Sequence, residues 1–203
     1  MAKPNRSSGA DRLRAARRVF RFFSIGLVVL AGVVVILAQV PPSQPDRWSE
    51  AGSEFVVRLP RSEVWQRLQN LRLAHNYVPG VEGVEMLTPL ERGVGASRRI
   101  LQEGGGTLDE TVVEWEEGSG FVIRLHRGPA GPPAPFEEAR FRYWIEGSEA
   151  GGTRLSLTIL YQPSGGRLGE WIDSAVLNAE MEARMDALAA SMRAYYESDG
   201  GVR

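Results

Sequence analysis

Residues 107–127, TLDETVVEWEEGSGFVIRLHR, decide how this chain folds. The residues on either side of Gly118-Ser119 are rich in β-branched and aromatic side chains, which favour β-strands. The turn between them is short, and a short turn makes its two strands antiparallel neighbours. The stretch therefore predicts one hairpin, and the chain around it predicts the rest of an antiparallel sheet.

Outward from this hairpin, glycine-containing turns separate further extended segments. A helix begins near Arg61, and a long helix over about residues 168–196 closes the pattern. Apolar residues recur in the long helix at three- and four-residue spacing, so we expect it to cover one face of the sheet, with Trp171 in the core. The predicted fold class is α+β. The predicted strands are residues 53–59, 82–88, 95–103, 107–117, 120–127, 137–146 and 153–162.

The turns also predict the strand register, and so which side chains point inward. The predicted cross-strand pairs are Val112–Leu125, Glu114–Ile123, Ile100–Glu110 and Arg98–Val112. This register gives the more apolar, inward face three charged residues, Arg98, Glu110 and Glu114. They would either anchor the head group of a ligand in an apolar pocket or form a salt bridge at the rim of the sheet. The sequence leaves both interpretations open.

Four further side chains are candidates for ligand binding. His75 and Tyr77 lie between the first helix and the second strand, while Tyr143 and Tyr161 belong to the inward-facing sets of their strands. His75 has the chemistry of an acid or base at neutral pH, but no partner acid follows from its spacing, so a surface histidine without a role is the alternative. For the tyrosines, the alternative is a core position with a satisfied hydroxyl.

These elements and their residues resemble the SRPBCC superfamily, whose members are START-like or polyketide cyclase/dehydrase-like. The resemblance covers about residues 53–197. It implies a helix-grip fold, in which a curved seven-stranded antiparallel sheet grips the long C-terminal helix around a deep cavity. Because the superfamily spans lipid carriers and cyclases, the resemblance does not name one activity. The residues that carry it are His75–Val81, Gly93–Arg99, Leu108–Val112, Trp115–Gly118, Gly120-Phe121 and Ala194–Glu197.

Residues 22–40, FFSIGLVVLAGVVVILAQV, form a 19-residue run without a charge. A helix of this length spans about 28 Å, which matches the hydrocarbon core of a bilayer. Residues 1–23 carry a net charge of +6, and basic flanks stay in the cytoplasm. We expect a transmembrane helix with a cytoplasmic tail, residues 1–21, and the main domain outside. A cleaved secretory signal and a buried core helix are the alternatives.

The main domain is predicted at residues 53–198, after a proline-rich linker at 41–52 and before a tail at 199–203. The chain from residue 24 onward carries a net charge of −7, which argues against nucleic-acid binding. The absence of cysteine excludes disulfides, thiolate metal sites and cysteine nucleophiles, and two histidines are too few for a three-histidine centre. No phosphate-binding or nucleophile motif is present. We expect no metal and no cofactor, and the sequence identifies no catalytic residue.

The expected function is a module, tethered to the cell membrane, that binds a hydrophobic small molecule or lipid in the cavity. The alternatives are a polyketide cyclase/dehydrase-like enzyme acting on a hydrophobic substrate and an interaction module with a vestigial cavity. The sequence does not decide whether the chain forms a homodimer. The uncharged segment GPAGPPAP, residues 128–135, is stiffened by proline and is expected to act as a lid on the cavity or to touch the bilayer. A plain connection is the alternative.

Overall fold

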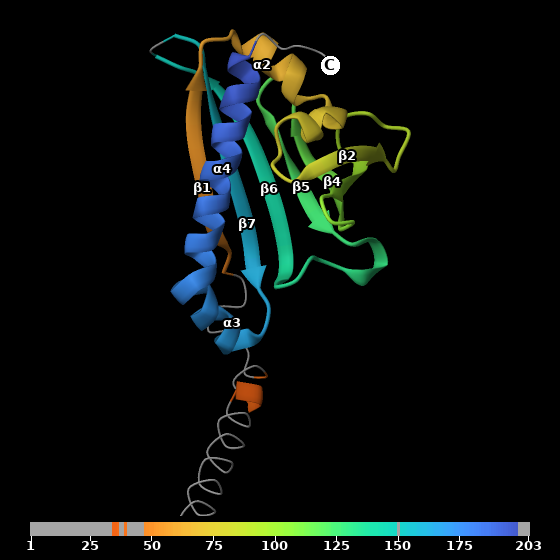
Figure 1. Ribbon diagram of the computed structural model, residues 1–203, viewed down its shortest axis with the longest axis vertical. Coiled ribbons are helices and arrows are strands. Elements are labelled where there is room, and N and C mark those ends of the chain that lie inside the picture. Colours follow the sequence, from red (N-terminus) through yellow and green to blue (C-terminus); the bar gives the residue numbers. More distant parts are fainter. Residues whose placement is uncertain (1–33, 37–38, 40–46, 150, 199–203) are drawn as a thin grey trace, which may run out of the picture.

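The computed structural model describes residues 34–36, 39, 47–149 and 151–198. In this part of the chain seven antiparallel strands form one curved sheet in the order β1-β7-β6-β5-β4-β3-β2 (Figure 1). Consecutive strands from β2 to β7 are neighbours, and β1 pairs with β7. All seven predicted strands are therefore confirmed. The strands are β1 (Ser49–Val57), β2 (Val81–Met86), β3 (Ser97–Gln102), β4 (Thr107–Glu116), β5 (Gly120–His126), β6 (Phe136–Gly147) and β7 (Thr153–Pro163).

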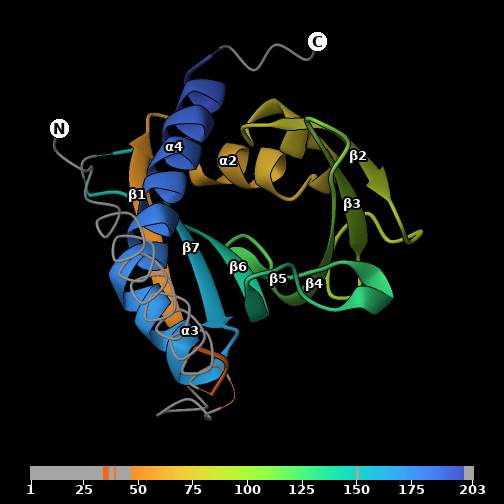
Figure 2. The ribbon, with the colours of Figure 1, turned by 60° about the horizontal axis from the view of Figure 1, so that its bottom comes forward.

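The predicted long helix is present, but it consists of three segments. These are α3 (Gly166–Ile172), a π-helical turn η3 (Asp173–Leu177) and α4 (Asn178–Glu197). The α4 helix lies along the inner face of the sheet beside β1 and β7 (Figures 1 and 2). Its buried side chains, spaced at helical intervals, join the core formed by the inner faces of the strands. Those side chains are Met181, Met185, Leu188, Ala189, Met192 and Tyr196.

The connection from β1 to β2 is helical and lies at the opposite end of the sheet from α3 (Figure 1). It contains α2 (Arg61–Leu68) and the 3-10 helix η1 (Leu71–Asn76). The Trp65 indole donates to the Glu117 carboxylate at 2.9 Å, and the Arg61 guanidinium donates to the Gly118 carbonyl at 2.8 Å. These bonds hold the connection against the β4–β5 turn and so fix η1 next to β3.

Both predicted registers are wrong by two residues. The structure pairs Arg98 with Glu110 and Val112 with Ile123. The β3–β4 turn is displaced by one residue from the predicted one, since the Gln102 amide donates to the Gly106 carbonyl at 2.8 Å. Because side chains alternate along a strand, a shift of two residues leaves Arg98 and Glu110 on the predicted inner face.

The prediction for Glu114 is wrong in a different way. A β-bulge interrupts the β4–β5 pairing between Val112 and Glu114 and inserts one extra residue. Beyond the bulge the two faces of β4 are exchanged, so Glu114 is exposed on the outer face. Trp115 takes the inner position instead and stacks on Phe121, with ring centroids 5.3 Å apart.

Two further expectations need correction at the ends of the domain. Trp171 is not in the core, because 67% of its surface is exposed on α3. The linker is shorter than predicted, since β1 begins at Ser49 and pairs there with Tyr161 of β7.

The predicted transmembrane segment, residues 22–40, lies outside the described residues except for 34–36 and 39. Val34–Ile36 are helical. Among the described residues, no helix combines the length and apolar character needed to cross a membrane.

Candidate functional site

Four of the predicted site residues meet in one buried group, which we call the Arg98 cluster: Arg98, Glu110, Tyr77 and Tyr143. Arg98 on β3 lies directly opposite Glu110 on β4, and its Nε donates to Glu110 Oε2 at 2.6 Å. A second guanidinium nitrogen, Nη1, donates to the Leu71 carbonyl of η1. The Tyr77 and Tyr143 hydroxyls also interact with the guanidinium. Only 1% of the Arg98 surface is exposed, so this is a core ion pair and not a rim salt bridge.

The electrostatics of the cluster fix its charge state. Burial alone would lower the pKa of Arg98, but the adjacent Glu110 carboxylate offsets this and holds that pKa above its ordinary value. Burial raises the pKa of both Tyr77 and Tyr143, against the opposing influence of the Arg98 charge. Both tyrosines are therefore protonated at neutral pH: each oxygen accepts from the Arg98 guanidinium, and each hydroxyl keeps one proton to donate.

A cavity of about 640 Å³ lies between the inner face of the sheet and α4. Its volume is within the range of small-molecule pockets, and most of its wall is apolar. The sheet contributes one side and the methionines of α4 the other, and flexible thioether side chains adapt to irregular apolar ligands. Apolar residues of the wall include Leu108, Leu125, Phe141, Ile159, Met181 and Met185.

Glu110 and Tyr143 belong to both the Arg98 cluster and the cavity wall. Arg98 and Tyr77 lie behind them, away from the wall. The buried ion pair thus positions a carboxylate acceptor, and the protonated Tyr143 supplies a donor, at one place in an apolar enclosure. Such a pair is suited to hold the hydroxyl or carbonyl group of an otherwise hydrophobic molecule.

The proline-rich segment also reaches this cavity. Residues 128–130 form a short 3-10 helix, η2 (Gly128–Ala130), and Pro133, Ala134 and Pro135 then line the cavity together with Phe136. The segment is held at both ends, because the Gly128 amide donates to His126 Nδ1 at 3.2 Å and the Ser164 amide donates to the Pro135 carbonyl at 2.8 Å. It therefore forms part of the cavity wall.

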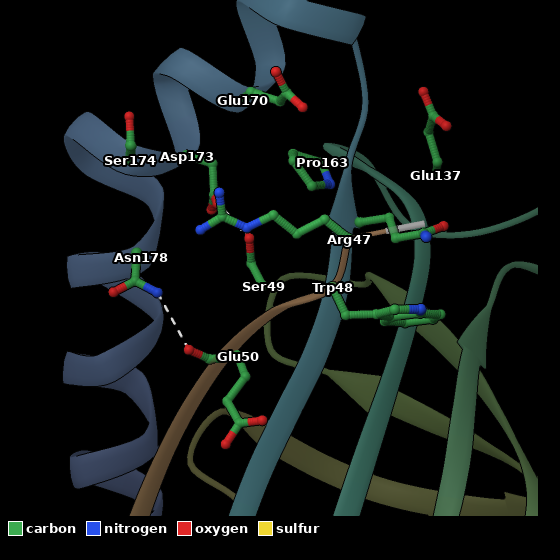
Figure 3. A pocket seen from close by; sticks show the side chains of 11 residues that line it. Arg47, Trp48, Ser49, Glu50, Glu137, Pro163, Glu170, Asp173, Ser174 and Asn178 are labelled. Carbon is green, nitrogen blue, oxygen red and sulfur yellow. Dashed lines mark hydrogen bonds between the residues drawn. The ribbon is translucent and has the colours of Figure 1, made fainter. Parts of the chain in front are cut away.

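Tyr161 is buried, but its hydroxyl points to a different place from the cavity. It donates to Asp173 Oδ1 at 2.7 Å, and the Ser49 hydroxyl donates to the other oxygen of the same carboxylate. These bonds tie β7, β1 and η3 together beside a hollow of about 380 Å³ (Figure 3). The hollow is lined mainly by polar and charged groups, among them Arg47 and Glu137, so it does not suit an apolar ligand.

His75 lies in η1 and is exposed, with its Nδ1 at 3.0 Å from the Arg72 carbonyl. It does not line the cavity. His126 is on the outer face, where Nε2 lies 2.8 Å from the Thr111 hydroxyl. Within the described residues, no group of three or more metal-binding side chains is placed to hold a metal ion.

Two arginines of the cavity wall, Arg127 and Arg184, were not among the predicted site residues. Arg184 is paired with Glu180 at 2.6 Å one turn earlier on α4. Arg127 directly precedes the proline-rich segment. Its position next to a predicted lid was the signal in the sequence that could have placed it at the cavity. Because the predicted register paired Leu125 with Val112, it did not show that Leu125 is the strand partner of Glu110.

Comparison with known proteins supports the fold. The profile of a family described as "Polyketide cyclase / dehydrase and lipid transport" matches residues 51–197. No curated protein matches the chain. Among solved structures, a Nitrosospira multiformis protein is 14% identical with a TM-score of 0.58 and covers 75% of this chain and 99% of its own.

Two further structures are similar in fold. Ara h 8.0201 is 12% identical with a TM-score of 0.54, covering 75% of this chain and 100% of its own. The di-domain ARO/CYC protein BexL is 17% identical with a TM-score of 0.56, covering 73% of this chain and 48% of its own. With the family profile spanning β1 to the end of α4, the chain belongs to the polyketide cyclase/dehydrase and lipid transport family and has its helix-grip fold.

Proposed function

We propose that this domain binds one hydrophobic small molecule or lipid in the cavity between the sheet and α4, and that residues 22–40 tether it to a membrane with the domain on the outer side. The observation that carries the binding proposal is the 640 Å³ cavity whose mostly apolar wall contains Glu110 and Tyr143, both members of the buried Arg98 cluster. The family's lipid transport description agrees with it. The tether rests on the sequence of residues 22–40.

Titration with a fluorescent fatty-acid analogue tests the binding proposal. The domain, residues 46–203, is expected to take up one probe per chain with an increase in emission, and unlabelled lipid should displace it. Absence of saturable binding for fatty-acid, phospholipid and isoprenoid probes alike would contradict the proposal.

Tyr143→Phe is expected to weaken binding of an analogue with a polar head group by about fivefold, because one hydrogen bond contributes about 1 kcal/mol. His75→Ala is the matched control, since His75 is exposed and does not line the cavity. Probe affinity measured for both variants checks the assignment. Equal effects of the two substitutions would show that the polar pair does not contact the ligand.

A cyclase/dehydrase-like enzyme is the second candidate function. The observation in its favour is that Glu110 and Tyr143 present an acceptor and a donor to the same part of the cavity. Since His75 lies elsewhere, general acid–base chemistry in this cavity would depend on Glu110 and Tyr143. Conversion of a poly-β-ketone substrate by the wild type, lost in Tyr143→Phe, would favour the enzyme over the carrier.

Replacing Gly128–Pro135 by an Asn-Gly turn is expected to accelerate ligand dissociation several-fold with little change in melting temperature. The reason is that Pro133, Ala134 and Pro135 line the cavity, while no residue of the replaced segment belongs to the buried apolar core. Stopped-flow displacement of the fluorescent probe measures the rate. An unchanged rate contradicts the lid hypothesis, and a large loss of stability would show that the segment is a structural part of the core.

A further inference from the structure

An apolar patch lies exposed on the helical segment between β7 and α4. Trp171, Ile172 and Val176, which we call the α3 patch, expose 67%, 44% and 61% of their surfaces. Single exposed apolar residues are ordinary, but three large ones on adjacent turns, including a tryptophan, are typical of a surface that contacts a protein or a membrane.

The π-helical turn η3 brings the three side chains together. Its backbone bonds join residues five apart, since the Asn178 amide donates to the Asp173 carbonyl. Val176 therefore lies one turn beyond both Trp171 and Ile172. The following residue, Leu177, is buried and lines the cavity. The α3 patch is thus on the outside of the same turn whose buried residue, Leu177, lines the cavity.

The patch also lies at the end of the domain where the described stretch 47–149 begins. Ser49 bonds to Asp173 of η3, and Arg47 and Ser174 line the same hollow (Figure 3). Residues 41–46 separate Arg47 from the uncharged run at 22–40. The seven Cα–Cα steps from Val40 to Arg47 span at most about 25 Å, so a membrane that holds this run lies within about 25 Å of Arg47.

The proline-rich segment is at the same end of the strands. It follows the last residues of β5 and precedes the first residues of β6, and β6 begins opposite the end of β7, where Phe136 pairs with Pro163. Its side chains carry no charge. Two uncharged surfaces and the attachment point of the predicted anchor therefore share one end of the domain.

We propose that Trp171, Ile172 and Val176 dock into the interfacial region of the membrane that anchors the chain, and that docking turns the part of the cavity lined by Leu177 and the proline-rich segment towards the lipid. Tryptophan is favoured at membrane interfaces, and the transfer of isoleucine and valine side chains out of water is favourable. The inference rests on the tether of the proposed function and adds the surface through which lipid enters.

The full chain contains no cysteine, so a single probe can be placed at will. Val176→Cys is labelled with a polarity-sensitive NBD group in the full chain reconstituted in phosphatidylcholine/phosphatidylglycerol vesicles. Val94→Cys is the matched control, because Val94 is also 61% exposed but lies between β2 and β3 at the opposite ends of the strands. Doxyl-labelled phosphatidylcholine in the vesicles reports contact with lipid.

The expected result is a blue-shifted emission and several-fold stronger doxyl quenching at position 176 than at position 94. Equal quenching at both positions overturns docking while the tether stands. A blue shift at 176 without quenching overturns it as well, because another copy of the chain then covers the patch. Release of the full chain from vesicles by carbonate overturns the tether and docking together. Probe binding by the isolated domain tests the cavity separately, so the two proposals fail in different experiments.

The double variant Trp171→Ser/Ile172→Ser tests whether lipid enters through this surface. Both residues are outside the cavity wall and exposed, so the variant is expected to keep its melting temperature and its affinity for the fluorescent fatty acid. Its rate of probe uptake from the vesicles that carry the full chain is expected to fall several-fold. An unchanged uptake rate contradicts lipid entry through this surface.

Discussion

Replacing Glu110 by glutamine is expected to lower the free energy of unfolding by about 3–5 kcal/mol, because it leaves the Arg98 charge buried without its partner. Arg98 and Glu110 expose 2% and 11% of their side chains and are joined at 2.6 Å. Water cannot solvate the guanidinium in place of the carboxylate at this depth. Urea unfolding of the domain followed by tryptophan fluorescence measures the loss.

Two controls separate the buried charge from a general effect of mutation. Glu180→Gln removes the acid of the exposed Arg184–Glu180 pair, and it is expected to cost at most about 0.5 kcal/mol. The double variant Arg98→Met with Glu110→Leu removes both charges and is expected to recover most of the stability. If Glu110→Gln costs no more than Glu180→Gln, Glu110 does not compensate a buried Arg98 charge.

Leu125→Trp combined with Met185→Trp is expected to weaken probe binding by about tenfold or more, equivalent to about 1.4 kcal/mol. Leu125 on β5 and Met185 on α4 belong to the sheet side and the helix side of the cavity. Two indole rings would occupy the volume that the ligand needs. Because they enter existing space, we expect the melting temperature to change little.

Ala190→Trp is the matched control for this pair, since Ala190 is an exposed position of α4 outside the cavity wall. It adds the same side chain without filling the cavity and is expected to leave probe affinity unchanged. Fluorescence titration of the three proteins makes the comparison. Undiminished affinity in the double tryptophan variant would place the ligand outside this cavity.

The sheet could be predicted because strand alternation and glycine turns are local signals. A register error of two residues preserved the faces, so Arg98 and Glu110 were correctly placed together on the inner side. The β-bulge after Val112 could not be predicted, because it depends on packing that brings Trp115 against Trp65 of α2, 5.1 Å away between ring centroids. Glu114 was therefore placed on the wrong face.

Other errors have a tertiary cause as well. Tyr161 has the strand position of a cavity residue, but its hydroxyl is taken by Asp173, whose approach depends on the π-helical turn η3. The prediction that Trp171 is buried assumed regular α-helical spacing along the whole helix. The π-helical turn departs from that spacing. Burial of Tyr77 beside Arg98 required the fold of η1 over β3, which spacing alone does not give.

The most direct test of a ligand-filled cavity is native mass spectrometry of the domain, residues 46–203, purified without detergent. We expect an adduct of one apolar molecule per chain, retained in His75→Ala and absent from the Leu125→Trp/Met185→Trp variant. Extraction and mass analysis of the released molecule would then identify it. An unliganded wild type that also fails to take up added lipid, or an adduct that persists in the cavity-filled variant, would contradict ligand binding in this cavity.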